Sequence, residues 1–165
     1  MYDPLSSDAA LKALLCRAWD WLGVSSDGYA QSGYSGDEEY LFPEWDKLLR
    51  ATEELVLQEA VDAVNDIWTA VALDNEEENL LDFISESASD AFVDQLIAVI
   101  PDHPQPNARW RAAELIRRRS SDAGIQVLQV LIHDVDSYVR KRAQGAYDSL
   151  TPVSERKKSG DALPL

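Results

Sequence analysis

Cysteine is nearly absent from this chain of 165 residues, which holds only Cys16. A single cysteine cannot form an internal disulfide, so the chain is not a disulfide-stapled secreted scaffold. It does not open with a basic segment followed by an apolar stretch, so we expect no signal peptide. Its apolar runs are far shorter than the roughly 20 residues that span a bilayer. We expect a cytoplasmic protein, with Cys16 as a core thiol on an apolar helix face.

Basic residues are also few. The chain has 15 Lys and Arg against 30 Asp and Glu, a formal net charge of −15. The imbalance lies in residues 1–100, because residues 101–165 carry slightly more bases than acids. A surplus of this size repels nucleic acid and anionic membranes and attracts basic partners. Solubility is an equally simple explanation of the charge.

Motifs for catalysis and metal binding are lacking. The sequence contains no phosphate-binding loop, dinucleotide fingerprint, nucleophile elbow or His-Glu-x-x-His pair. His103 and His133 fall at equivalent turns without a cysteine partner, so we expect exposed side chains and no zinc site. We therefore expect no enzyme, no cofactor and no metal.

Strict alternation of apolar and polar residues, which would indicate β-strands, is missing too. Apolar residues recur instead with helical periodicity, which predicts an all-α fold. A helix is expected over 5–22, with Gly23 as its stop. Two apolar stripes over 43–73 leave open whether one helix continues or a break falls near 57–59. Further helices are expected near 80–88, 90–100, 107–119, 122–133 and 137–150. Residues 1–152 should form one helical domain, followed by a flexible tail at 153–165.

The same unit occurs twice between Ser89 and Leu150. Ser89-Asp90-Ala91 is followed by Leu96, Ile100 and Asp102, and Ser121-Asp122-Ala123 is followed by Leu128, Ile132 and Asp134. Later in each unit, Ala108-Arg109-x-Arg111-Ala112 corresponds to Val139-Arg140-x-Arg142-Ala143. A period of about thirty residues built from two helices is typical of a stacked helical array.

Asp136-x-x-Val139-Arg140-x-x-Ala143 and the segment from Ala108 to Leu115 resemble HEAT repeats. This resemblance covers residues 89–150, about two repeats. It implies a short right-handed stack of antiparallel helical hairpins, a HEAT-like α-solenoid, and says little of function. In that family the arginine commonly bonds the aspartate of the turn. The resemblance therefore implies structural pairs of Arg109 with Asp102, and of Arg140 with Asp134 or Asp136.

The connection at 23–42 is rich in glycine and serine yet also carries aromatic residues. Tyrosines are common anchors of interfaces, and carboxylates speed encounter with a basic partner. Alternatively, the loop folds back and its tyrosines pack inside. We predict a partner-binding surface made of this loop and the acidic residues of the following helical segment: Tyr29, Tyr34, Asp37, Glu38, Glu39, Tyr40, Glu53, Glu54, Asp62 and Asp66.

An acidic helical chain of this size is similar in character to the bacterial immunity proteins. The resemblance implies a stoichiometric inhibitor that blocks a basic toxin domain such as a nuclease. The alternative is a general scaffold or adaptor without inhibitory role. A lesser alternative is a relative of the HEAT-like DNA glycosylases, because several cations group on two neighbouring helices: Arg109, Arg111, Arg117, Arg118, Arg119, Arg140, Lys141 and Arg142.

Overall fold

The computed structural model describes residues 7–32, 41–74 and 77–151. Every regular element within these residues is helical, which confirms the all-α prediction. The predicted tail at 153–165 lies outside the described residues. The elements are α1 (Ser7–Leu22), α2 (Ser26–Ser32), α3 (Trp45–Leu57), η2 (Val61–Ala63), α4 (Val64–Leu73), α5 (Asn79–Ser87), α6 (Asp90–Ala98), η3 (Ile100–Asp102), α7 (Pro106–Arg118), α8 (Asp122–Leu131) and α9 (Ser137–Leu150), of which η2 and η3 are short 3-10 helices.

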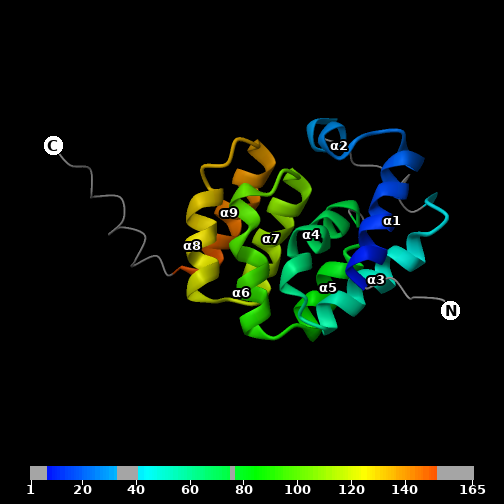
Figure 1. The fold of residues 1–165 in the computed structure, drawn as a ribbon. Helices are drawn as coiled ribbons and strands as arrows, with labels where there is room; N and C mark the ends of the chain where they lie inside the picture. The colour runs from blue at the N-terminus through cyan, green and yellow to red at the C-terminus, as the bar shows by residue number, and fades with distance from the viewer. Residues whose placement is uncertain (1–6, 33–40, 75–76, 152–165) are drawn as a thin grey trace.

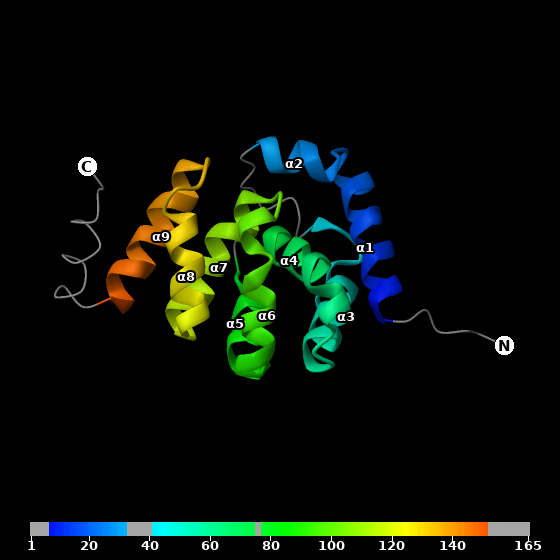
Figure 2. The same ribbon diagram turned by 60° about the vertical axis from the view of Figure 1, so that its left-hand side comes forward.

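Most of the helices contact their second neighbour along the chain. One series runs α1, α3, α5, α7, α9, and the other runs α4, α6, α8, each helix packing on the next of its series. Figure 1 shows the result as a row from α1 at one end to α8 and α9 at the other. Helix α2 departs from this order and lies crosswise at one edge of the row (Figure 2). Buried apolar side chains continue from Leu11 in α1 to Ala146 in α9.

The two sequence repeats form equivalent helices. The Ser89 hydroxyl accepts a hydrogen bond from the Phe92 N–H at 3.2 Å, and the Ser121 hydroxyl accepts one from Gly124 N–H at 3.0 Å. Each serine thus caps the first helix of its unit. The buried small residues of α7 and α9, Ala108, Ala112, Ala113, Ala143 and Ala146, let these second helices pack closely.

The segment at 43–73 is interrupted after Leu57, the last residue of α3, and η2 and α4 follow from Val61 and Val64, so a break near 57–59 is the correct one of the two alternatives. The Glu59 N–H bonds Val56 O, and the Ala60 N–H bonds Leu55 O, both at 3.0 Å. Glu59 itself has a left-handed φ of 50°. This is the Schellman ending of a helix, in which the residue after the cap turns the chain. The same bonds end α1, where Gly23 holds the left-handed position at φ 68°.

The connection at 23–42 is more ordered than its composition indicates, because it contains α2. Ser25 starts this helix by accepting a hydrogen bond from the Gly28 N–H at 3.0 Å. Tyr29 then points inward, is 3% exposed, and packs its ring 5.2 Å from that of Trp19. Tyr29 is therefore not an exposed interface anchor. It packs inside the molecule, which was the alternative prediction for this residue.

Two predictions about burial are wrong. Cys16 is exposed, because it lies off the stripe of Leu11, Leu14 and Ala18 that faces the core. His103 is buried, because α4 covers its turn: His103 Nε2 lies 3.3 Å from Asn65 O, and Nδ1 accepts a hydrogen bond from the Gln105 N–H at 3.2 Å. This burial lowers the pKa of His103. His133 is exposed, as predicted.

Candidate functional site

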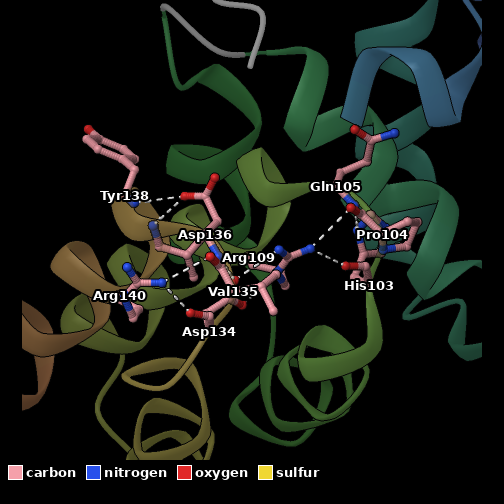
Figure 3. Close-up of polar contacts among 10 residues, drawn as sticks. His103, Pro104, Gln105, Arg109, Asp134, Val135, Asp136, Tyr138 and Arg140 are labelled. Atoms are coloured by element: carbon pink, nitrogen blue, oxygen red, sulfur yellow. Dashed lines mark hydrogen bonds and ion pairs between the residues drawn. The ribbon is translucent and has the colours of Figure 1, made fainter. Parts of the chain in front are cut away.

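Arg109 joins the turn before α7 to the turn after α8 (Figure 3). Its Nε and Nη2 donate to the two carboxylate oxygens of Asp134 at 2.7 and 3.0 Å. Its Nη1 donates to His103 O at 2.7 Å and to Pro104 O at 3.1 Å. The predicted partner, Asp102, is therefore wrong. Nη1 of Arg109 bonds the carbonyls of its own turn. Nε and Nη2 point to the next unit, where they bond Asp134.

Arg140 repeats half of this arrangement. Its Nη1 donates to Asp134 O at 2.7 Å and to Val135 O at 3.0 Å, the residues six and five positions before it. Arg109 uses the carbonyls at the same two offsets. Arg140 thus pairs with Asp134, one of its two predicted partners, but through the backbone carbonyl of Asp134, because the Asp134 carboxylate bonds Arg109. Asp136 Oδ1 instead caps α9 by accepting from the Tyr138 and Val139 N–H groups at 2.8 and 3.0 Å.

A cleft of about 440 Å³ opens between α2 and these turns. Gln105 fixes one wall, because its Nε2 donates to the carbonyl and the hydroxyl of Ser26 at 2.8 and 3.0 Å. Figure 3 shows Gln105 reaching toward the helix that carries Ser26. We call this space the α2 cleft. Its lining comes from three separate segments of the chain and consists of Asp27, Ala30, Pro104, Pro106, Arg109, Val135 and Asp136.

The α2 cleft combines apolar surface with two carboxylates that make no ion pair with a described residue. Val135 is 93% exposed although it is a large aliphatic residue. The Arg109 charge is balanced by Asp134, and four of its five N–H groups are already donated. Asp27 and Asp136 have no ion pair with a described residue. The cleft is therefore rich in hydrogen-bond acceptors and poor in spare donors.

The predicted partner-binding residues are spread over several elements. Glu53 and Glu54 lie on α3, Asp62 lies in η2, and Asp66 lies on α4. Asp66 is 3.8 Å from Lys12 Nζ, and its pKa is raised because partial burial outweighs the attraction of that lysine. None of these four lines the α2 cleft. The remaining predicted residues after Tyr29, namely Tyr34, Asp37, Glu38, Glu39 and Tyr40, lie outside the described residues.

The cations that the sequence groups on α7 and α9 are largely engaged within the molecule. Arg118 bonds Glu78 at 2.9 Å and also Asp82, and Glu114 accepts from Arg117 at 3.0 Å and from Arg142 at 2.7 Å. Arg111 is fully buried. Across the described residues, nine of the Lys and Arg side chains make ion pairs: Lys12, Arg17, Lys47, Arg109, Arg111, Arg117, Arg118, Arg119 and Arg142.

Many carboxylates, by contrast, have no cation beside them. Exposed Asp and Glu residues without an ion pair in the described part of the chain are Asp20, Asp27, Asp46, Glu54, Glu59, Asp62, Glu86, Asp102 and Asp122. Residues 7–32, 41–74 and 77–151 contain no group of three His, Cys, Asp or Glu side chains placed to hold a metal ion.

Sequence reasoning missed the α2 cleft, although one signal was present. Val135 interrupts a polar turn between Asp134 and Asp136, which is an unusual place for a large aliphatic residue. The wall formed by Asp27 and Ala30 could not be found in this way, because the position of α2 depends on contacts with distant residues.

None of the helices in the described residues is long and apolar enough to cross a membrane. Comparisons of the chain with protein-family models, curated proteins and solved structures find no match.

Proposed function

We propose that the chain is a HEAT-like protein-binding module. The repeat at 89–150 supports this proposal, and so do the contacts between second-neighbour helices. Arg109 and Arg140, which occupy matching positions of the repeat, also donate to carbonyls at the same two offsets before them. Stacked helical units offer extended surfaces and open turn edges, which such proteins use for recognition.

We propose that the partner is a basic protein domain, because the surface of the chain carries many exposed carboxylates without an ion pair to a described residue. The observation that carries this proposal is the unequal pairing of charge: nine described cations are held by carboxylates of the chain itself, while the exposed carboxylates given above are left over. A partner of opposite charge is attracted by this field, and its encounter rate rises. We propose specifically a stoichiometric inhibitor, of the immunity-protein kind, that blocks a basic toxin domain such as a nuclease.

Affinity capture from an extract of the native source tests this proposal. The expected result is one basic protein at a one-to-one ratio, released by raised salt because screening weakens charge attraction. Titration of the chain against the activity of the captured protein should then end at equimolar amounts. Capture with no loss of activity would favour the scaffold alternative, and recovery of acidic proteins would overturn the charge argument.

Charge reversal measures the contribution of the acidic residues Asp37, Glu38 and Glu39, the first predicted part of the surface. Reversing Asp37, Glu38 and Glu39 should slow association with the captured protein at low salt and leave its dissociation rate nearly unchanged. A matched triple reversal at Glu53, Glu54 and Asp62 tests the second predicted part of the surface. An unchanged association rate removes the corresponding segment from the site.

The glycosylase alternative requires cations free to contact phosphates. Arg109, Arg118 and Arg119 bond carboxylates of the chain, so nucleic acid would have to compete with these pairs. A mobility-shift assay with duplex DNA measures this directly. Salt-dependent binding at micromolar concentration would support the alternative.

A further inference from the structure

We propose that the α2 cleft receives an arginine or lysine side chain of the basic partner. This inference rests on the proposed function and adds a location and a recognition chemistry to it. The size of the cleft fits such an occupant. Its volume of about 440 Å³ lies within the roughly 300–1,000 Å³ typical of ligand sites. One long side chain fits within this space together with part of the chain that carries it.

Charge complementarity identifies the head group. Asp27 and Asp136 line the cleft without an ion pair to any described residue, while Arg109 is balanced by Asp134. Oδ1 of Asp136 caps α9, and Oδ2 makes no hydrogen bond to a described residue. An occupant that donates several hydrogen bonds and carries positive charge suits this set of acceptors.

The apolar part of the lining identifies the rest of the side chain. Pro104, Pro106 and Val135 present aliphatic surface beside the carboxylates. Arginine and lysine lay their methylene stems on such surface while the charged head reaches acceptors at the rim. Burial of Val135 beneath the stem would also remove the most exposed large aliphatic side chain of the described residues from water.

Titration with n-butylguanidinium chloride tests the inference without the partner. The expected result is a saturable change in the amide NMR signals of Ala30, Val135 and Asp136. The neutral isostere n-butylurea should give much smaller changes, because it lacks the charge. Asp27→Asn together with Asp136→Asn should weaken butylguanidinium binding roughly fivefold, which corresponds to about 1 kcal/mol for the two carboxylates together. Asparagine is also a good helix cap, so α9 is expected to keep its start.

A matched control replaces two exposed carboxylates outside the cleft, Asp46→Asn with Asp62→Asn, and should leave the affinity unchanged. Equal binding by both double variants would overturn the inference, as would signal changes spread over the whole acidic surface. The outcome is separable from the proposed function. If a basic protein is captured equally well by the Asp27/Asp136 variant, the proposed function stands and the cleft does not. If butylguanidinium occupies the cleft but no basic protein is captured, the recognition chemistry of the cleft stands, and the proposed function fails together with the partner assigned to the cleft.

Discussion

Arg109 and Arg140 hold equivalent positions in successive units but differ in burial. Arg109 is 7% exposed and bonds both oxygens of Asp134, whereas Arg140 is exposed and bonds only backbone carbonyls. We expect Arg109→Ala to lower the free energy of unfolding by about 3–5 kcal/mol, because it leaves the Asp134 charge buried without its cation. Arg140→Ala should cost only about 1 kcal/mol, the usual contribution of exposed hydrogen bonds. Urea denaturation measures both.

Arg109→Lys separates charge from geometry in the same experiment. Lysine keeps the charge but cannot make the two parallel bonds to Asp134 or span to His103 O at the same time. The free energy of unfolding of the Arg109→Lys variant should therefore lie between that of the wild type and that of Arg109→Ala. Equal losses for Arg109→Ala and Arg140→Ala would show that the bond between the units contributes nothing beyond the bonds within each turn.

Asp74 is a buried carboxylate next to the start of α5. Its Oδ2 accepts a hydrogen bond from the Leu80 N–H at 2.7 Å, while its Oδ1 has no partner among the described residues. Burial raises the pKa of Asp74 to about 6, against the opposing effects of the Leu80 N–H and Arg111. The folded state thus binds the Asp74 proton more tightly than the unfolded state does. The resulting stability is fully present below pH 3.8 and is lost as the pH rises through about 6.

Asp74→Asn removes this pH dependence while keeping an acceptor for Leu80. Relative to the wild type, the variant should gain roughly 2–3 kcal/mol of unfolding free energy between about pH 3.5 and pH 7.5, since one pKa unit corresponds to about 1.4 kcal/mol. The difference between the two proteins cancels the opposite effect of His103, whose pKa is lowered by burial. A constant difference across this range would mean that the pKa of Asp74 is the same in the folded and the unfolded state.

At the scale of the helices, the packing of α8 on α7 depends on a glycine. A Cβ at Gly124 would lie 2.7 Å from Cγ2 of Ile116, a fully buried β-branched residue that cannot move aside. A Cβ at Gly145 in α9 would have no neighbour within 4 Å. Gly124→Ala should therefore destabilise by about 1–3 kcal/mol through overpacking, whereas Gly145→Ala should stabilise by up to about 1 kcal/mol through helix propensity. Thermal or urea unfolding measures both, and a gain at Gly124 would contradict the close contact.

The ends of helices were predictable where the sequence has a capping or stop residue. Gly23 stops α1 as expected, because glycine takes a left-handed φ without strain. The stop after α3 uses the same bonds with Glu59 in the left-handed position, and a glutamate gives no such signal in a sequence. The periodicity of residues 43–73 therefore could not distinguish one continuous helix from two helices with a break near 57–59. In the repeat region, the serine caps and the recurring apolar positions located α6 to α9 closely.

The contacts that build the candidate site were harder to predict, because they are made over long sequence distances. The Gln105–Ser26 bonds span 79 residues and place α2 over the turns. The burial of His103 depends on Asn65, and the choice of Asp134 by Arg109 depends on the stacking of the next unit. Local patterns carry information on faces, caps and turns, but not on which distant element covers them.

At the scale of the whole molecule, charge is divided between two roles. Internal ion pairing leaves the formal charge of −15 unchanged, because each pair joins one cation to one carboxylate. Pairs such as Arg109–Asp134 are buried and add to cohesion, whereas exposed pairs contribute little. The surplus carboxylates repel one another, and this repulsion opposes the folded state.

This balance predicts that salt stabilises the isolated protein. The screening length falls from about 30 Å at 0.01 M to about 10 Å at 0.1 M ionic strength, which weakens repulsion between distant exposed carboxylates more than the short buried pairs. We expect the unfolding free energy to rise by on the order of 1 kcal/mol over this range of sodium chloride. Replacing Glu53, Glu54 and Asp62 with their amides should reduce the rise, because three repelling charges are lost. A stability that falls with added salt would show that attraction within the ion pairs outweighs the repulsion among the surplus carboxylates.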